Sequence, residues 1–551
     1  YPANLGVTTF LGLSLKAAID YVGEFEPGDV IITNDPYTTG GIATHLPDIH
    51  VFKPLFAGGR LAAFAWAFIH SSDIGGAVPA SISPAFTELF QEGLRIPPMK
   101  LYRGGRPDPV LPAIIRANCR VPDDTWGDIN AMVAALNTAE ARFQELVDRF
   151  GPGAVCQAAA DLLDAAEQRA RRVIAAIPDG TYTFSDFLDS DVVSDVPVRI
   201  KVTMTVDGDR IHLDYTGTDP QLAAALNLPA FGERHPFLAT TLLYHILTED
   251  PDIPLPAAGA GQAAIVVLAA HDRRKGLTRV SVLEPISGGG GGLPGQDGCD
   301  ANDVPSAFLR NAPVESIERH LPVLVERYDL VPDSAGGGEH RGGFGVQIHF
   351  RVLEDDSVVT CRGLERFRFR PWGVYGGLPG SPGRAVLNPG TEGERDLGKI
   401  TAARFRAGDV VAIIGAGGGG YGDPLRRDPQ RVLADWRAGL LSEEAARRDY
   451  GVVIRDGAVD VEATAALRAA RRSMREAPEP FNFCAEREAL ERQWPPAVLD
   501  AVNRWLYRQP VNKRPLPRSA LFEMGAAREV VTEDDLAGFI AELVGLYGAE
   551  A

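Results

Sequence analysis

The chain has 551 residues and a formal net charge of −18, with 45% hydrophobic and 23% charged residues. These values are typical of a soluble globular protein with more than one packed region, because single cores stop growing beyond about 250–300 residues. The acidic balance argues against a general nucleic-acid binder and against binding to anionic membranes. The sequence also lacks an apolar run of membrane-spanning length and an opening secretory signal, so we expect no membrane partner.

The first part of the chain, residues 1–120, alternates short apolar strands with Gly/Pro turns and a few helices. Residues 130–177 then show helical spacing, with Met132, Leu136 and Val147 on one face and a break at Gly151. We expect a first helix up to that glycine and a second helix over 154–177.

The pattern next changes to strict alternation over residues 198–217, where Asp207-Gly208 is a hairpin signal. A short helix is expected at 236–248. Residues 260–425 are predicted to be β-rich, since the chain holds 59 glycines and 41 prolines and many of them punctuate this stretch.

The C-terminal part is predicted to be helical. Asp428-Pro429 is a good helix start, with proline in the first turn, and Thr532 is the expected N-cap of the last helix. Together these patterns predict a mixed α+β fold of three regions. They are an N-terminal α/β region at 1–180, a Gly-rich β-dominated region at 181–425 and a helical region at 426–551.

Two glycine runs stand out, at 286–298 and 415–423. Consecutive glycines can turn backbone N–H groups inward and bind an anion, or they can simply satisfy tight turns with positive φ. Neither run is a Walker A loop or a dinucleotide-binding glycine motif at a strand–helix junction. We therefore expect no nucleotide site and assign no cofactor-binding residue in this chain.

The five cysteines are scattered and contain no CxxC motif; they are Cys119, Cys156, Cys299, Cys361 and Cys484. Such an odd, dispersed set argues against a disulfide framework and fits a reducing compartment. We expect a cytoplasmic protein.

The segment from Asn34 to Gly76 holds the densest set of chemically active side chains, and three of the ten histidines fall in it. It contains five candidates beside turns and short strands: Asp35, His45, Asp48, His70 and Asp73. Imidazole and carboxylate together suit a divalent metal such as Zn, Mn or Fe. The alternative is an acidic turn followed by a strand, and the spacing alone leaves both interpretations open.

Several long motifs resemble one known family. GDVIITNDPYTTGGIATHLPD, HSSDIGG and AFTELFQEGLRIPPMKLYRGG are followed by ERYDLVPDSAGGGEHRGGFG, RPWGVYGGLPGSPGR and GAGGGGYGDPLRRDP. In this order they resemble the hydantoinase B/oxoprolinase family over most of residues 1–455. That family includes the B subunits of ATP-dependent hydantoinases, the C-terminal half of 5-oxoprolinases, and subunits of acetone and acetophenone carboxylases.

The resemblance implies a metal centre with His45, Asp48 and His70 as ligands. Asp35 and Asp73 are then candidates for a general base, a further ligand or a carboxylate that orients a ligand imidazole. Family members usually carry an acidic motif ahead of the position that matches Tyr1, and the sequence given does not contain it. The sequence leaves open whether a further metal ligand lies in such a segment.

The resemblance also implies a function. We expect a metal-dependent subunit of a complex that hydrolyses cyclic amides of the hydantoin, oxoproline or lactam type. A partner subunit with an actin-like ATPase fold, of the hydantoinase A type, would use ATP to phosphorylate the amide oxygen. The alternatives are a subunit of an acetone/acetophenone-type carboxylase, and a non-catalytic scaffold subunit.

Overall fold

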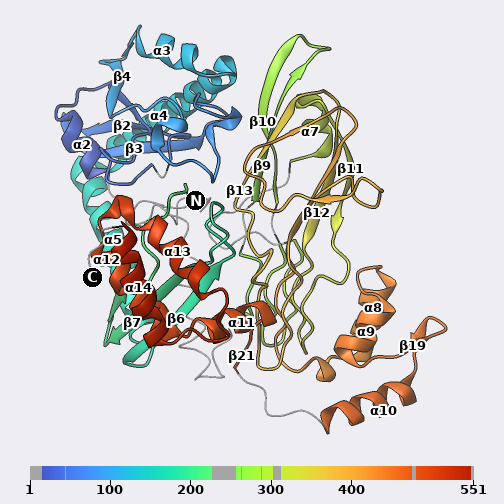
Figure 1. Cartoon of the computed structure of the whole chain (residues 1–551). Helices are drawn as coiled ribbons and strands as arrows, with labels where there is room; N and C mark the ends of the chain where they lie inside the picture. Colours follow the sequence, from blue (N-terminus) through green and yellow to red (C-terminus); the bar gives the residue numbers. More distant parts are fainter. Residues whose placement is uncertain are drawn as a thin grey trace.

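The protein has the predicted mixed α+β fold, built from several antiparallel sheets and helices (Figure 1). A computed structural model describes residues 15–43, 45–225, 256–261, 264–286, 288–301, 312–473 and 480–547. The helix expected at 236–248 lies outside these residues. The three-region division proposed from the sequence stays a prediction.

The N-terminal part contains a five-stranded sheet in the order β3-β2-β1-β4-β5, with helices packed on it. Its elements are α2 (Lys16–Val22), β1 (Val30–Thr33), β2 (Asp48–Ala57), β3 (Arg60–His70), η1 (Pro79–Ser81), η2 (Leu89–Gln91), β4 (Met99–Arg103), β5 (Arg106–Pro107), α3 (Leu111–Asn118), α4 (Pro122–Phe150) and α5 (Pro152–Ile174). The two long helices confirm the prediction for 130–177, although α4 begins earlier, at Pro122, where proline and two acids suit a helix start.

Alternation along β2 decides which side chains face α4. Ile49, Val51 and Leu55 share a buried apolar cluster with Met132 and Val133 of α4. The alternate residues, beginning with Asp48, therefore point to the opposite face of the sheet, because successive strand residues face opposite ways.

The middle of the chain forms two sheets, in the orders β10-β9-β13-β17 and β11-β12-β18-β15-β16. One apolar cluster contains residues of both sheets, including Val266, Leu268, Ile348, Phe350 and Val411, so the sheets pack as a sandwich. The elements are β9 (Ala264–Asp272), β10 (Leu277–Ile286), α7 (Val314–His320), β11 (Val323–Leu330), β12 (Val346–Val352), β13 (Ser357–Arg362), β15 (Arg384–Leu387), β16 (Arg395–Asp396), β17 (Ala403–Phe405) and β18 (Val410–Ile414). The β-rich prediction for 260–425 is confirmed.

The sequence suggested that the two glycine runs either bind an anion or form tight turns with positive φ, and the structure shows a different role for them. The N–H of Gly289 donates to the carbonyl of Ala416, and the N–H of Gly418 donates to that of Gly343, so these groups bind neighbouring backbone rather than a ligand. Only Gly295 and Gly422 among the described glycines of the two runs have positive φ. The decisive property is the missing Cβ, which lets backbone segments approach closely.

A third sheet, β6-β7-β8, packs against the C-terminal helices. The predicted hairpin is present, with Asp207 paired to Arg210. The sheet and its partners are β6 (Gly180–Leu188), β7 (Val198–Asp207), β8 (Arg210–Asp214), β14 (Gly373–Val374), β21 (Phe481–Asn482), α11 (Ala485–Gln493), α12 (Pro496–Arg508), η4 (Val511–Lys513), α13 (Pro515–Gly525) and α14 (Glu533–Tyr547). Asp500 of α12 forms ion pairs with Arg199 and Lys201 of β7.

A small helical group projects from the sandwich. It consists of η3 (Pro424–Arg426), α8 (Pro429–Arg437), α9 (Glu443–Tyr450), β19 (Ile454–Arg455), β20 (Ala458–Val459) and α10 (Val461–Arg472). As predicted, Asp428 caps α8 through the N–H of Gln430, and Thr532 caps α14 through the N–H of Asp535.

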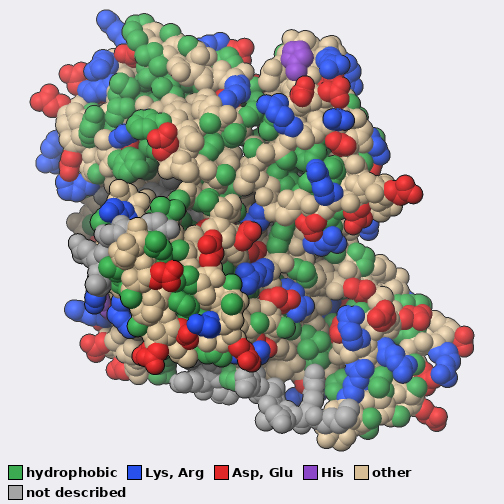
Figure 2. All heavy atoms as spheres, viewed as in Figure 1, with side chains coloured by type: hydrophobic (Ala, Val, Ile, Leu, Met, Phe, Trp, Pro, Cys, Tyr) green, Lys and Arg blue, Asp and Glu red, His purple; other side chains and the backbone are tan. Residues whose placement is uncertain are grey.

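Three further features concern the surface charges, the cysteines and the length of the apolar helices. Acidic and basic side chains are interspersed over the face shown in Figure 2, rather than gathered by sign. All five cysteines are free thiols. Within the described ranges, no helix combines the length and the apolar character needed to cross a membrane.

Candidate metal centre

The hairpin of β2 and β3 brings two of the predicted ligands together. Gly58 and Gly59 both have positive φ, as the tight turn between two twisted strands requires. The strands then pair so that Asp48, the first residue of β2, lies opposite His70, the last residue of β3. Directly opposite residues share one face of a sheet, so the spacing of these two residues is a consequence of hairpin pairing.

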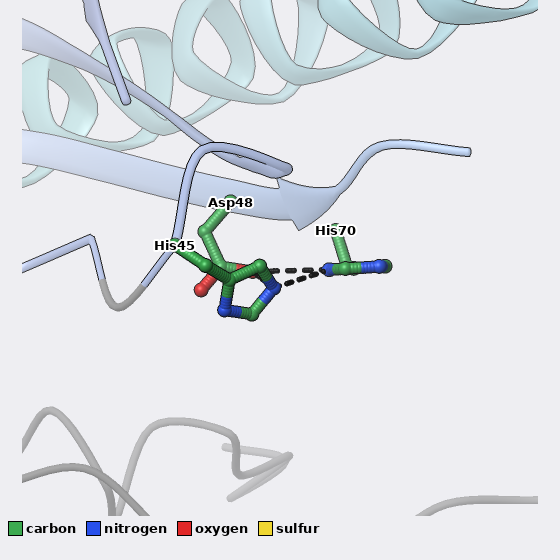
Figure 3. A group of neighbouring side chains, drawn as sticks. All are labelled: His45, Asp48 and His70. Atoms are coloured by element: carbon green, nitrogen blue, oxygen red, sulfur yellow. Dashed lines mark hydrogen bonds and ion pairs between the residues drawn. The ribbon is translucent and has the colours of Figure 1, made fainter. Parts of the chain in front are cut away.

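The third predicted ligand reaches the same place through a turn. The N–H of Asp48 donates to the carbonyl of His45 at 3.1 Å, and the N–H of Ser71 donates to that of Pro47 at 2.7 Å. The first bond folds His45 back over the start of β2, and the second ties the turn to the end of β3. Figure 3 shows the three side chains converging from these positions, on the side away from the helices.

The donor atoms form a compact triangle. Nε2 of His45 lies 2.9 Å from Nδ1 of His70 and 3.4 Å from Oδ1 of Asp48, and the latter two atoms are 3.3 Å apart. Metal–ligand bonds of about 2.0–2.2 Å place neighbouring ligand atoms about 2.8–3.1 Å apart at right angles and about 3.3–3.6 Å apart at the tetrahedral angle. The three separations therefore lie within the range expected for ligand atoms around one metal ion. In the part of the chain that the structure describes, this is the one group of three or more such ligands.

Burial and neighbouring charges favour the metal-binding protonation states of His45 and Asp48. The side chains of His45 and Asp48 are 12% and 7% exposed, and that of His70 is 24% exposed. Burial lowers the pKa of His45 well below its usual value; Asp48 opposes this effect and Arg362 adds to it. Burial opposes ionisation of Asp48 too, but the adjacent histidines hold its pKa far below the usual range. A neutral imidazole and an ionised carboxylate are the forms that bind metals.

Asp73 lies in the loop after His70, and each of its carboxylate oxygens accepts two hydrogen bonds. Their donors are the N–H groups of Gly75, Ala80 and Arg120, and the guanidinium of Arg120, at 2.9–3.1 Å. Asp73 is fully buried. These contacts hold the loop in shape and include none of the three predicted ligands. The catalytic role predicted for Asp73 stays a prediction.

Asp35 is also buried and also organises a loop. Its carboxylate accepts hydrogen bonds from the N–H of Tyr37, the hydroxyl of Thr38 and the guanidinium of Arg95, at 3.0, 2.7 and 2.8 Å. Burial raises the pKa of Asp35, but the hydrogen bonds, led by that from Arg95, outweigh it and lower the pKa. The structure places Asp35 outside the ligand triangle, and its predicted catalytic role remains a prediction.

His50, the third histidine of the segment, packs against aromatic residues of β3 in the same sheet. Its ring stacks on Trp66 and Phe68, and its Nδ1 accepts a hydrogen bond from the indole N–H of Trp66. Burial lowers the pKa of His50 to about 4. His50 therefore packs on a face of the sheet, where it lies opposite Phe68 of β3.

Three residues at the site were not predicted from the sequence. Glu92 accepts a hydrogen bond from the N–H of Leu46, and the side-chain amide of Asn34 donates to the carbonyl of Leu46. Both therefore hold the turn between His45 and Asp48. Burial raises the pKa of Glu92 to about 7, and nearby Asp48 contributes to the rise.

The third of these residues, Arg362, comes from the sandwich: its Nη1 lies 3.2 Å from Nε2 and 3.3 Å from Nδ1 of His45. Asn34 and Glu92 lie inside the family-like motifs, which is a signal that could have singled them out. The position of Arg362 follows only from tertiary packing.

Comparison with known proteins gives one family and several relatives that align with most of this chain. The family model described as hydantoinase B/oxoprolinase matches residues 5–255 and 238–424. The B subunit of a putative D-/L-hydantoinase from Pseudomonas sp. (strain NS671) is 29% identical, with 81% of this chain and 84% of the relative aligned. The beta subunit of caprolactamase from Pseudomonas jessenii is 30% identical, covering 83% of this chain and 88% of the relative.

Two solved structures also resemble the structure of this chain. The crystal structure of the ATP-dependent caprolactamase from Pseudomonas jessenii matches with a TM-score of 0.73 and 27% identity, over 84% of this chain and 89% of that chain. A nucleotide-free acetone carboxylase structure matches with a TM-score of 0.72 over 99% and 83% of the two chains. At 18% identity, the second likeness concerns the fold alone.

Proposed function

The chain belongs to the hydantoinase B/oxoprolinase family, and from this premise we propose that it is the metal-dependent subunit of an ATP-dependent cyclic-amide hydrolase. Two of its relatives are themselves named as subunits, one B and one beta, which supports a role within a larger complex. We propose that the partner is an actin-like ATPase subunit, which transfers a phosphoryl group from ATP to the amide oxygen. The five free thiols fit the cytoplasm as the compartment.

The observation that carries this proposal is the donor triangle of His45, Asp48 and His70. A divalent Zn, Mn or Fe ion held there would supply Lewis acidity, polarising an oxygen of the substrate and making water a better nucleophile near neutral pH. The chain's own residues would present neutral imidazoles and an ionised carboxylate, and would hold them through the hairpin and the turn. Asp73 and Asp35 stay the proposed candidates for the base, with their present contacts favouring a positioning role.

Phosphorylation explains why two subunits are needed. An amide carbon is a poor electrophile, and placing the phosphoryl group on its oxygen makes water addition feasible. The ring nitrogen then accepts a proton and leaves as an amine, and a second water releases phosphate from the acyl phosphate. The sum is a ring-opened acid, ADP and phosphate from one cyclic amide, one ATP and two waters.

Metal content tests the proposal most directly. The purified chain should hold about one divalent metal, measured by elemental analysis, and His45→Ala or His70→Ala should release it because each removes one of three donors. Circular dichroism should show an unchanged fold. The matched control is His271→Ala, which replaces an exposed histidine of β9 and should keep the metal. Full metal occupancy in the double variant His45→Ala/His70→Ala would contradict the assignment.

Wild-type protein without any bound metal would favour the scaffold alternative. The carboxylase alternative is tested with the ATPase partner added. Cyclic amides are offered in one reaction, and a ketone with labelled bicarbonate in another. Ring opening of an amide supports hydrolysis. Incorporation of label into the ketone, with no ring opening of an amide, would make carboxylation the favoured function instead.

A further inference from the structure

Helix α5 exposes an apolar face along most of its length. The residues that form this face follow each other at three- and four-residue spacing: Val155, Ala159, Leu162, Ala166, Ala170 and Val173. None of the 23 side chains of α5 is buried. Leu162, its neighbour Leu163 and Val173 are 71%, 73% and 63% exposed. Because helices are stabilised mainly by packing of their apolar face, we expect this face to have a partner.

Both ends of α5 are fixed, and only the turns between them are bare. At the first turn, Pro152 lies 3.5 Å from the position that a Cβ would take on Gly58, in the turn between β2 and β3. At the last turn, Arg171 forms an ion pair with Asp209, and Ile174 packs on the apolar cluster of the third sheet. α5 thus runs from the N-terminal sheet to the third sheet, and these contacts hold its exposed face in place (Figure 1).

The charges of α5 indicate which partner fits this face. The acids Asp161 and Asp164 precede Ala166, and the bases Arg169 and Arg172 follow it. A second α5 helix laid alongside in the parallel direction would place acids beside acids. In the antiparallel direction, centred on Ala166, the acids of each helix lie beside the bases of the other. Flanking charges of this kind set the partner and the orientation of paired helices.

The outer pair of these charges is available for such a contact. Within the described part of the chain, Asp161 accepts a hydrogen bond from the side-chain amide of Gln157, and Arg172 donates to the backbone carbonyl of Gln168. Both partners are neutral groups of α5 itself. Pairing with a second helix therefore breaks no ion pair of Asp161 or Arg172.

The sizes of the apolar side chains agree with the same alignment. Antiparallel helices centred on Ala166 bring Leu162 of one copy opposite Ala170 of the other, because the two positions are equally far from the centre. Val173 lies opposite Ala159 for the same reason. A large side chain thus meets a small one in each case, which lets facing helices interdigitate.

We propose that the apolar face of α5 binds the same face of a second copy of this chain, antiparallel and about a two-fold axis near Ala166. A contact in which both copies use one patch is closed, so it produces a dimer and not a filament. The contact involves neither the metal-ligand triangle nor the ATPase subunit, so it stands apart from the proposed function.

Sedimentation of the full chain over a wide range of concentration tests the dimer. The wild type should reach the mass of two chains. Leu162→Glu should raise the dimer dissociation constant by at least about 100-fold, because the two-fold axis brings the buried carboxylate into the interface twice. Leu516→Glu on α13 is the matched control, since Leu516 is 68% exposed, and it should match the wild type. Circular dichroism should show the same fold in all three proteins.

Charge reversal tests the electrostatic part of the contact. Arg169→Glu/Arg172→Glu makes both halves of α5 acidic and should weaken the dimer by about 10-fold, since each exposed pair contributes up to about 1 kcal/mol. Adding Asp161→Arg/Asp164→Arg to that variant restores opposite halves and should bring the affinity back to within about 3-fold of the wild type. Failure of this rescue would show that the charges do not face each other and would overturn the pairing.

Disulfide cross-linking tests the direction of the two helices. In a background with the exposed Cys156 and Cys299 replaced by serine, Ala166→Cys should form a linked dimer on oxidation. Ala159→Cys should not, because an antiparallel pair places its two copies about 20 Å apart. Equal cross-linking of both variants would overturn the antiparallel arrangement.

Two further results would overturn the inference. One is a dimer that Leu162→Glu leaves intact, which would place the contact elsewhere on the molecule. The other is a wild-type chain that stays monomeric. If Leu162→Glu then abolished binding of the ATPase subunit to that monomer, the face would belong to that subunit instead of a second copy.

Discussion

His70 and Asp73 are three residues apart, yet the first lies among the proposed metal ligands and the second stabilises a loop. His70 ends β3 and contributes to the donor triangle, while Asp73 turns back and accepts four hydrogen bonds within its own loop and from Arg120. A general base needs an oxygen within hydrogen-bond reach of the proton it removes. The contacts of Asp73 leave both oxygens occupied by donors that shape the chain.

Asp73→Asn separates a positioning role from a catalytic one. The amide places an N–H donor against N–H donors, so we expect the free energy of unfolding to fall by about 3 kcal/mol, as for a broken buried ion pair. Denaturant unfolding measures this, with Asp164→Asn on the exposed face of α5 as a control that should change little. Unchanged stability together with lost turnover would instead support Asp73 as the base.

The glycine-rich segments leave no space for a Cβ atom at several of their positions. A Cβ built on Gly289 would lie 1.9 Å from the carbonyl oxygen of Gly343, and one built on Gly418 would lie 1.9 Å from that of Gly290. Real Cβ atoms do not come so close to backbone, and backbone cannot rotate away as a side chain can. The stretch that looked like an anion-binding loop is therefore a close-packed backbone contact between distant segments.

Gly289→Ala tests this packing. We expect a loss of at least about 3 kcal/mol in unfolding free energy, at the upper end for overpacking, because both neighbours are backbone. The control is Gly393→Ala, since a Cβ there meets only side-chain atoms at 3.6 Å or beyond. Thermal unfolding of the two variants should differ clearly. A Gly289→Ala protein as stable as Gly393→Ala would refute the packing argument.

For the whole molecule, Asp500 links the C-terminal helices to the third sheet. Burial opposes its ionisation, but Lys201 and Arg199 outweigh burial and lower its pKa below the usual 3.8. A carboxyl with a depressed folded pKa stabilises the protein fully above its unfolded pKa, and this contribution is lost as the pH falls through the folded pKa. The link between helices and sheet should therefore weaken in acid.

Asp500→Asn should lower the melting temperature at pH 7, where the carboxylate is ionised. Below about pH 3.8 the gap between wild type and variant should shrink, because the wild-type carboxyl loses its charge as well. Melting curves at pH 7, 5 and 3.5 follow this change. A gap that does not depend on pH would show that packing, rather than charge, connects α12 to β7.

Catalysis is also expected to belong to the assembled complex. No Walker A loop occurs in the sequence, so the isolated chain should neither hydrolyse ATP nor open a lactam. Activity should appear when the ATPase partner is added, measured as coupled ADP release and ring opening. Robust ATP hydrolysis by the pure chain alone would count against the division of labour.

Local pattern was enough to predict much of this protein. The helices around Gly151, the hairpin at Asp207 and the caps at Asp428 and Thr532 follow from periodicity and turn chemistry, which act over a few residues. The three proposed ligands came from the family-like motifs, and the structure brings them together because a hairpin and a turn are also local.

Tertiary structure decided everything that joins distant segments. Arg362 stands 317 positions from His45, and no spacing rule connects a strand end in the sandwich to a turn in another sheet. Three other features likewise depend on how segments distant in the sequence come together. They are the contact of Asp35 with Arg95, the contact of Asp73 with Arg120, and the close approach of Gly289 to Gly343. Sequence periodicity reports which face of an element is buried, whereas the partner of that face is chosen by the fold as a whole.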